Sequence, residues 1–531
     1  MTDATPGGRP VSLPAAMLWF FALAAAPLLL GTPPPLQDLP NHLASAFIAE
    51  HLQDYPGLEV NGYLRSNSAL ALWLHLLGGP LGLIGAARAF VALVLAATAA
   101  SLAWLGWSVG GPGRMASIAL LGWPLVHSFF VAIGFLNFSL GLAGAWAALA
   151  LAHRREQAQR DAAIHRGALE RAAGVAVPLI AWYAHPFPIT LATGLVGLQA
   201  VLGAPARQWP SRSLRAVAPF LPALVLSLAT AAAHLAKPAA RPVLFSNPIG
   251  FDTPWDSLVH LWIYGPVAFS WLEATTLLPI LALAVLGWGE RRRGVPFFTW
   301  PAMGLLLLAV FCVPTQGSNW GFLNARFVPF LWVGLLLRAP LTLPRWLQLA
   351  LPVAALAYGG GLWADYTRLE HERRQFCAAI PAVPERATLL PLIFRPRGSA
   401  TFTEPLRHAW GYYVLERTTS APLLFAVERS YPLTYRVWPP AQLIPPAIDE
   451  LARRQESPSS TCLAEGLDPH DAPRCLALWR QRWEEFWRVG TPAFDHILTW
   501  GARPDFPSVL PPDYAPVLVQ GPLVLYARQP R

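Results

Sequence analysis

Long apolar runs separated by short polar segments dominate the first 364 residues of the chain. Many of these runs are about 18–22 residues long, the length that an α-helix needs to cross about 30 Å of hydrocarbon. We therefore expect eleven membrane-spanning helices. They cover residues 11–30, 82–109, 114–133, 135–152, 170–186, 188–204, 214–236, 266–288, 296–313, 326–339 and 346–364. The apolar stretch 68–77 is too short to span and predicts an interfacial or re-entrant helix on the outer side.

The pattern changes after residue 364, where charged residues and prolines become frequent. Alternating and apolar runs predict strands over 388–394, 422–426 and 496–500, and a hairpin formed by 517–519 and 523–526. Helical spacing extends over 404–416 and over 475–489, where four large aromatic residues fall on one side. The sequence thus predicts an α-helical membrane domain, 1–364, followed by a water-soluble α/β domain, 365–531.

Composition agrees with a membrane protein. Hydrophobic residues make up 54% of the 531 residues and charged residues only 13%, whereas soluble domains carry about a quarter charged residues. This excludes a soluble globular enzyme and a disordered chain. Lys237 is the single lysine beside 38 arginines, a bias typical of GC-rich bacterial genomes. The net charge of +9 comes largely from arginines in loops between spans, so we expect no nucleic-acid partner.

The positions of the basic residues predict the orientation, because cytoplasmic loops are enriched in Lys and Arg. With the N-terminus inside, three basic residues fall in the short outer loops: Arg65, Lys237 and Arg241. The inner segments hold Arg9, Arg114, Arg154, Arg155, Arg160, Arg166, Arg171, Arg207, Arg212, Arg215, Arg291, Arg292, Arg293, Arg338 and Arg345. We therefore expect a multi-pass protein of the bacterial inner membrane. Its N-terminus would be cytoplasmic, and its long loops 31–81 and 237–265 and its C-terminal domain periplasmic.

Three of the four cysteines lie in this predicted periplasmic domain, where disulfides persist. Cys377, Cys462 and Cys475 allow three pairings. Cys462 and Cys475 close the shortest loop, and we favour that pair, which leaves Cys377 as a thiol.

The first predicted outer loop contains the most informative polar residues. Asp38 follows the first span closely and precedes an apolar stripe at helical spacing, which predicts a helix on the bilayer surface with its polar side carrying Asn41 and Ser45. Asp38 before Leu39-Pro40 is a good N-cap of that helix. Alternatively, its carboxylate acts as a general base for a membrane-bound substrate, with His42 one turn away as its orienting partner.

This arrangement resembles the GT-C superfamily of membrane glycosyltransferases, in which an acidic residue follows the first span. The stretch Gln37-Asp38-Leu39-Pro40-Asn41-His42-Leu43-Ala44 resembles a segment of poorly characterised bacterial members. The segments 134–141 and 326–330 are also similar to recurrent segments of that group. The resemblance implies an inverting transferase that uses a polyprenyl-phosphate sugar as donor and a lipid or cell-envelope glycan as acceptor.

The resemblance also assigns candidate residues. Asp38 would be the catalytic base, assisted by His42, and Arg326 would bind the donor phosphate, although an arginine at a span boundary also reaches toward lipid headgroups. Further candidates for binding the donor phosphate or sugar are Asn137, Asn319, Asn324, Arg88 and His185.

The sequence departs from the family pattern in one respect. Many GT-C enzymes carry a second acidic residue in the next outer loop, but residues 129–138 contain none. We therefore expect no cofactor and assign no metal ligand, and leave a divalent metal requirement open. A membrane transporter or flippase and a non-catalytic GT-C-like scaffold are the alternative functions.

Overall fold

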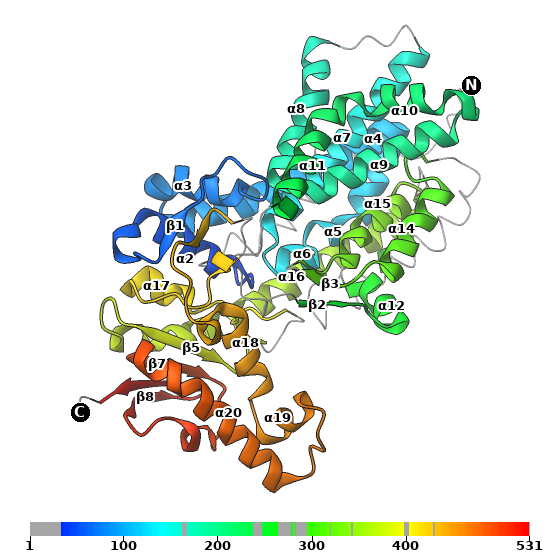
Figure 1. Cartoon of the computed structure of the whole chain (residues 1–531). Helices are drawn as coiled ribbons and strands as arrows, with labels where there is room; N and C mark the ends of the chain where they lie inside the picture. Colours follow the sequence, from blue (N-terminus) through cyan, green and yellow to red (C-terminus); the bar gives the residue numbers. More distant parts are fainter. Residues whose placement is uncertain are drawn as a thin grey trace.

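The structure is a computed structural model that describes residues 33–161, 167–236, 247–263, 278–279, 282, 295–318, 320–340, 343–397, 403–427 and 431–529. It is mostly helical. In Figure 1 the helices α4–α11, α14 and α15 gather in one half of the molecule, and the four-stranded sheet with α18–α20 lies in the other. The expected spans 11–30 and most of 266–288 lie outside the described residues.

Most of the predicted apolar ranges correspond to helices. The helices of residues 69–376 are α3 Ala69–Leu81, α4 Leu83–Leu121, α5 Trp123–Val126, α6 Phe129–Ala132, α7 Leu136–Arg160, α8 Ala168–Ala184, α9 Pro186–Leu202, α10 Trp209–Val217, α11 Leu221–Ala236, α12 Pro254–Ile263, α14 Trp300–Cys312, α15 Val328–Leu336 and α16 Arg345–Phe376. The predicted helix 114–133 is not continuous. Its first part belongs to α4 beyond a kink at Gly110 and Gly111, and α5 and α6 form the remainder as separate short helices.

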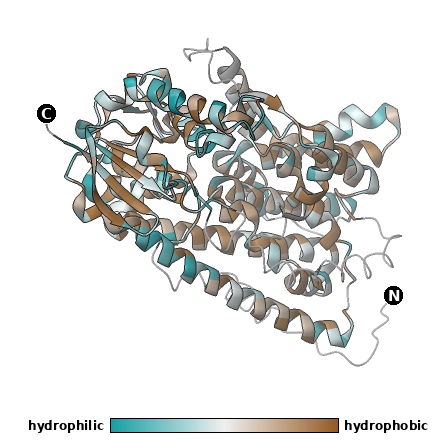
Figure 2. Cartoon of the chain, turned by 90° about the horizontal axis from the view of Figure 1, so that it is seen from below, coloured by the Kyte–Doolittle hydropathy of each residue, from teal (hydrophilic) through white to brown (hydrophobic). Residues whose placement is uncertain are grey.

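Four helical stretches in the described part of the chain are long and apolar enough to cross a membrane: Leu83–Leu121, Leu136–Arg160, Ala206–Ala232 and Arg345–Ala382. These stretches are compatible with a membrane location. Figure 2 shows that hydrophobic residues predominate in the helical half, whereas hydrophilic residues gather toward the end that carries the C-terminus. Two arginines counted above as inner loop charges are buried instead: Arg114 donates to the carbonyl of Leu337, and Arg338 to that of Gly334.

The C-terminal part is built around one mixed sheet. Its strands are β5 Leu389–Ile393, β7 His496–Trp500, β8 Tyr514–Gln520 and β9 Leu523–Arg528, in the order β5-β7-β9-β8. β5 and β7 are parallel, and β8 and β9 form the predicted hairpin, in which Gly521 has a positive φ of 57°. The predicted strand 422–426 is wrong, because these residues form turns and the start of a 3₁₀ helix at Phe425–Val427.

The helices of this part are α17 Gly411–Arg417, α18 Pro445–Arg454, α19 Pro458–Ala464 and α20 Ala472–Ala493. The expected helix 404–416 begins only at Gly411, after a series of turns. The aromatic side of α20 is buried as predicted, with Trp479 and Trp483 wholly inaccessible. Cys462 and Cys475 form the expected disulfide, and Cys377 is a free thiol.

The predicted outer loop 31–81 joins the two halves of the molecule. It contains α2 Leu39–Glu50 and β1 Leu58–Val60, and β1 pairs antiparallel with β6 Leu433–Tyr435. Tyr55 donates to the carbonyl of Thr419 at 3.0 Å, and Asp54 forms an ion pair with Arg386 at 2.8 Å. The expectation that α2 has a solvent-facing polar side is wrong, because Asn41 is wholly buried against the C-terminal part.

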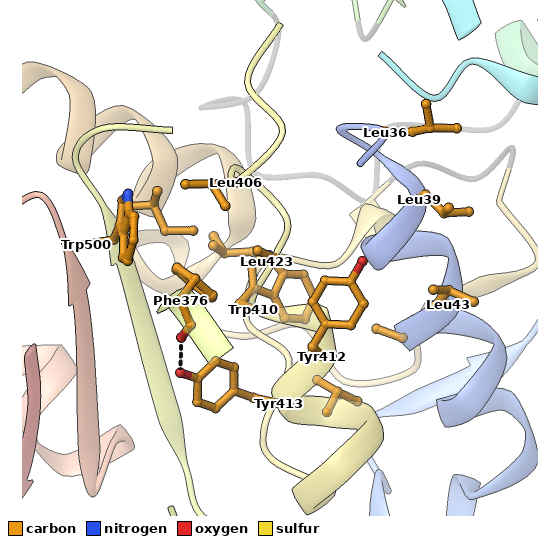
Figure 3. Close-up of a cluster of buried hydrophobic side chains, with 14 of the residues drawn as sticks. Leu36, Leu39, Leu43, Phe376, Leu406, Trp410, Tyr412, Tyr413, Leu423 and Trp500 are labelled. Carbon is orange, nitrogen blue, oxygen red and sulfur yellow. Dashed lines mark hydrogen bonds between the residues drawn. The ribbon is translucent and has the colours of Figure 1, made fainter. Parts of the chain in front are cut away.

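A single hydrophobic core extends across this junction. Figure 3 shows α2, which carries Leu39 and Leu43, beside Trp410 and Tyr412 of the C-terminal part. Backbones approach closely here, since a Cβ added to Gly411 would lie only 2.8 Å from the carbonyl carbon of Pro40. The start of α17 can therefore pack on the first turn of α2 only with glycine at this position.

We predict that Gly411→Ala destabilises the protein by about 1–3 kcal/mol, because overpacking forces the two helices apart. The measurement is the apparent melting temperature of the purified protein in detergent. Gly194→Ala is the matched control, since a Cβ added at that helical position of α9 meets no atom within 4 Å. Equal melting temperatures for the two variants would contradict this account of the junction.

Candidate functional site

Asp38 occupies the N-cap position of α2 but does not cap it. Its side chain makes no capping hydrogen bond to the helix, and the residue is only 5% exposed. Its backbone N–H donates to the carbonyl of Ile133 at 3.1 Å, in the turn that joins α6 to α7. Gly134 in this turn has a φ of +86°, and a Cβ there would lie 2.9 Å from the amide nitrogen of Asp38. Glycine thus allows the turn to hold the aspartate against the helical half.

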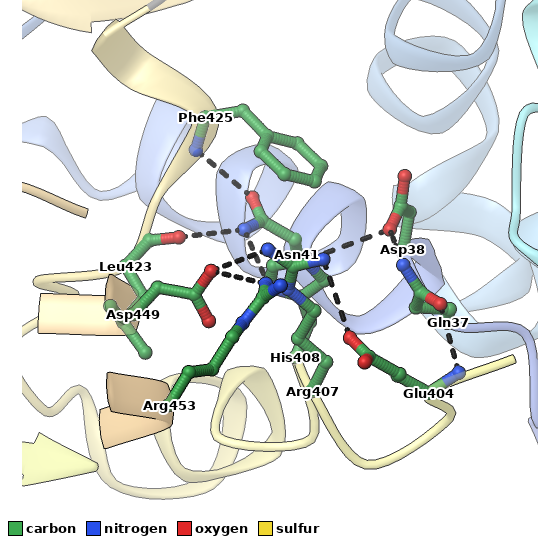
Figure 4. Close-up of polar contacts among 10 residues, drawn as sticks. All are labelled: Gln37, Asp38, Asn41, Glu404, Arg407, His408, Leu423, Phe425, Asp449 and Arg453. Atoms are coloured by element: carbon green, nitrogen blue, oxygen red, sulfur yellow. Dashed lines mark hydrogen bonds and ion pairs between the residues drawn. The ribbon is translucent and has the colours of Figure 1, made fainter. Parts of the chain in front are cut away.

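Two side-chain nitrogens contact Oδ1 of Asp38 from the opposite direction (Figure 4). Nε2 of Gln37 donates to it at 3.3 Å, and Nε2 of His408 lies 3.5 Å away. Gln37 is itself anchored, because its Oε1 accepts from the backbone N–H of Glu404 at 2.9 Å. The carboxylate therefore lies at the boundary between the helical half and residues 403–410 of the C-terminal part.

Asn41 connects α2 to the same region. Its Nδ2 donates to the carbonyl of Leu423 at 2.9 Å and lies 3.4 Å from Nδ1 of His408. Its Oδ1 accepts from the backbone N–H of Phe425 at 3.3 Å. Burial of a polar side chain is costly unless its hydrogen bonds are made, and here the turn around Leu423 supplies them.

Charged residues continue the network away from Asp38 (Figure 4). Arg407 contacts Glu404 and Asp449, and Arg453 also pairs with Asp449. Burial alone would lower the pKa of Arg407, but Asp449, Glu404 and Asp38 raise it. Burial and the charge of Arg407 lower the pKa of His408 well below its usual range. Burial and the nearby positive charge thus favour the neutral imidazole of His408.

His42 lies one turn along α2, and its ring contacts aromatic residues. It stacks on Tyr431 with a centroid separation of 5.8 Å and meets the edge of Phe425 at 5.7 Å. It also lines a small cavity of about 20 Å³ together with Ser45 and Tyr63, which is room for about one water molecule. Burial lowers the pKa of His42 to about 4.

Arg326 lies in an aromatic pocket in the helical half. Its guanidinium is centred 5.3–6.0 Å from the rings of Phe135, Phe138 and Phe187. Its Nη1 lies 2.9 Å from Nε2 of His185, and its Nη2 donates to the carbonyl of Gly321. The structure thus brings two sequence candidates, Arg326 and His185, into contact. Cation–π attraction from three rings stabilises a positive charge that is 5% exposed.

Asp38 and Arg326 flank the same short turn. Gly134 packs on Asp38, and the ring of the next residue, Phe135, faces the guanidinium of Arg326. Asp38 and Arg326 are each only 5% exposed, so both charged groups are packed within protein. A ligand that contacts both must therefore displace side chains around this turn.

Of the remaining candidate residues, one bonds to backbone groups and another to a carboxylate. Asn137 accepts from the N–H of Leu70 and donates to the carbonyl of Asn67, each at 2.8 Å, and so fixes the start of α3. Asn324 donates to Asp252 at 2.8 Å. Arg88 is half-buried in the first turns of α4. Asn319 lies outside the described residues.

The sequence analysis missed His408, Arg407 and Glu404. Their spacing of three and four residues is a weak signal for a shared face, but it does not indicate that α2 lies opposite. Among the described residues no group of three or more His, Cys, Asp or Glu side chains could hold a metal ion. No protein-family model matches the sequence, and a search of curated proteins finds no match. The function is therefore argued from the geometry.

We predict that acidification weakens the junction around α2. In the unfolded chain a histidine binds its proton near pH 6.5, whereas folded His42 does so only near pH 4. The unfolded state therefore binds more protons between these values, and stability falls as the pH falls. For His42 alone the loss between pH 7 and pH 5 is about 2 kcal/mol.

The apparent melting temperature, measured from pH 7 to pH 5, tests this prediction. His42→Gln should reduce its pH dependence, whereas His470→Gln, which removes an exposed imidazole before α20, should not. An unchanged pH dependence in His42→Gln would show that His42 titrates alike in both states.

Proposed function

We propose that the protein is an inverting membrane glycosyltransferase that transfers a sugar from a polyprenyl-phosphate donor to an acceptor on the outer face of the bacterial inner membrane. The observation that carries this proposal is the state of Asp38. Its carboxylate is buried, makes no capping bond to α2, and is contacted by two nitrogen groups from separate residues. A hydrogen-bonded carboxylate of this kind can accept a proton from an acceptor hydroxyl.

The reaction needs a base and a cation on opposite sides of the anomeric carbon. In the proposed step Asp38 takes the proton of the acceptor hydroxyl, whose oxygen forms a bond to the anomeric carbon. The bond from that carbon to the phosphate oxygen breaks, and its electrons leave with the lipid phosphate. Arg326 is the candidate for neutralising the phosphate, since a guanidinium pairs well with phosphate oxygens. Its position across the Gly134–Phe135 turn from Asp38 supports this pairing.

The packing of the site has a consequence for this mechanism. Both charged groups are only 5% exposed, so a donor can reach them only after the aromatic rings around Arg326 move aside. Exclusion of water around a glycosyl donor is useful, because water competes with the acceptor hydroxyl as nucleophile. We therefore propose that donor binding opens the turn and that closure over the donor precedes transfer.

The proposal includes the eleven-span topology, with residues 365–531 on the periplasmic side. α16 supports it, since its 32 residues correspond to about 48 Å, more than the hydrocarbon thickness requires. Its first half is apolar, and its last turns carry Glu370, Arg373 and Arg374. A helix of this kind suits a last span that continues into a soluble domain.

A reporter enzyme fused after Arg531 tests the topology. We expect activity from a reporter that folds only in the periplasm, and none from one that works only in the cytoplasm, because Arg-rich loops are retained inside. The reverse result would contradict the outer location of the site.

Asp38→Asn tests the catalytic role. We expect a folded variant that transfers sugar at least a hundredfold more slowly, since an amide cannot take the proton of the hydroxyl. The assay uses proteoliposomes with a panel of radiolabelled polyprenyl-phosphate hexoses and pentoses and envelope extract as acceptor. It follows both loss of donor and labelling of product.

Asp54→Asn is the matched control, because it removes the same charge from the same segment at the ion pair with Arg386. We expect the control to retain transfer. Full activity of Asp38→Asn would contradict the proposed base. Absence of turnover of every donor by the wild-type protein would favour the scaffold, and movement of donor across the bilayer without transfer would favour a flippase.

A further inference from the structure

We propose that His408, held in one tautomer by Asn41, is a positioning residue that keeps Asp38 in its proton-accepting form. This inference rests on the proposed function and extends it, because it makes the C-terminal part a contributor to the catalytic site. Asp38 and Asn41 belong to α2 and its N-cap, whereas His408 lies some 370 residues later in the turns before α17.

The orientation of the Asn41 amide is determined by backbone groups. A carbonyl can only accept a hydrogen bond and a backbone N–H can only donate one. Because Leu423 presents its carbonyl at 2.9 Å and Phe425 its N–H at 3.3 Å, the amide nitrogen and oxygen of Asn41 cannot be exchanged. The group that faces Nδ1 of His408 is thus the NH₂ group, a donor.

The tautomer of His408 follows from this donor. A neutral imidazole carries one proton, and the nitrogen without it is an acceptor. Since Nδ1 faces the NH₂ group of Asn41 at 3.4 Å, Nδ1 accepts and the proton lies on Nε2. Nε2 faces Oδ1 of Asp38 at 3.5 Å, so His408 directs an N–H group at the carboxylate.

A second donor is oriented in the same way. The backbone N–H of Glu404 occupies Oε1 of Gln37, so the amide nitrogen of Gln37 must face Asp38. Gln37 donates a hydrogen bond to Oδ1, the Nε2–H of His408 faces the same oxygen at 3.5 Å, and N–H groups directed at a carboxylate favour its charged form. The charged form is the one that a general base requires before each turnover.

Burial and the surrounding charges favour a neutral His408. Burial is the largest effect that lowers its pKa, and Arg407, His42 and Arg453 lower it further. The acidic groups Glu404 and Asp449 pair with the arginines rather than with the imidazole. The turn at 129–138, which packs on Asp38 from the helical half, contributes no charged residue. His408 therefore acts as a fixed donor and not as a second proton carrier.

Two variants of His408 separate positioning from simple packing. His408→Leu removes the donor, and we expect the acid limb of the pH–rate profile for donor turnover to move up by about one to two pH units. His408→Gln keeps an N–H group at the position of Nε2, and we expect a profile close to that of the wild type. Tyr55→Phe is the control, since it breaks another hydrogen bond across the same junction, to Thr419, without touching Asp38.

If His408 served only to hold the two parts together, His408→Leu and Tyr55→Phe would lower the melting temperature without moving the acid limb. That result would overturn the inference. The same conclusion would follow if His408→Gln behaved like His408→Leu, because a retained donor would then have no effect.

A spectroscopic measurement tests the tautomer without any activity. Solid-state NMR of the full-length protein in lipid bilayers, labelled with ¹⁵N-histidine, distinguishes the two neutral tautomers and the imidazolium. His408→Gln identifies the signal by its loss. We expect a neutral ring at pH 7 with the proton on Nε2, and a change of form in Asn41→Asp, whose carboxylate accepts a proton from Nδ1.

A proton on Nδ1 in the wild-type protein, or an imidazolium at pH 7, would overturn the inference even if Asp38 proves essential for transfer. Conversely, a wild-type protein that consumes no donor but shows the expected Nε2 tautomer contradicts the proposed function and leaves the arrangement of the three residues intact. The two failures are therefore distinguishable.

Discussion

The burial of α2 on both sides is the constraint on which the rest of the structure depends. The helix carries Leu39 and Leu43, which need apolar cover, and Asn41, which needs hydrogen-bond partners. A helix at a membrane surface could leave its polar side to water, but here His408, Leu423, Phe425 and Tyr431 contact it. The close approach at Gly411 and the pairing of β1 with β6 are consequences of this cover.

Once α2 is buried, its N-terminal carboxylate cannot rely on water for solvation. A charged group in this position must receive hydrogen bonds or lose its charge. Gln37 donates a hydrogen bond to the carboxylate, and Nε2 of His408 lies 3.5 Å from the same oxygen. The backbone N–H of Asp38 donates to Ile133 in the turn before α7. The C-terminal part is thus more than an appendage, because it supplies one of the groups that the aspartate contacts.

Local patterns in the sequence were sufficient for most helices and for the β8–β9 hairpin. Apolar length located α7, α8, α9 and α16, and the Gly521 turn located the hairpin, because each depends on neighbours in the chain. The disulfide could also be predicted from nearby residues, since Cys462 and Cys475 are separated by only 13 positions in the chain. The break expected between the spans 82–109 and 114–133 coincides with the kink at Gly110 and Gly111, but the further breaks that separate α5 and α6 within 114–133 were not predicted.

Contacts between distant segments could not be predicted in this way. Hydrophobic spacing indicates that one side of a helix is buried but not which segment covers it. The partner of Asn41 was therefore unknown, and the polar side of α2 was expected to face water. The same limit affected Asn137 and Asn324, whose amides serve Leu70 and Asp252. It also affected Arg114 and Arg338, which were counted as charges of inner loops and are buried against carbonyls near the end of α15. Charge counts for topology are weakened by arginines of this kind.

The energetics of the site bear on the choice between an enzyme and a scaffold. Replacing a buried ionic network by well-packed apolar side chains is often neutral or stabilising, so such a network is weak evidence of a structural need. Asp38 does not cap α2, and the aromatic rings around Arg326 could enclose an apolar residue equally well. A scaffold that only joined the two halves would already have the β1–β6 pair and the core around Trp410. In the function proposed above, the buried carboxylate and the buried guanidinium on either side of one turn act on a charged substrate, and this is the reason we favour an enzyme over a scaffold.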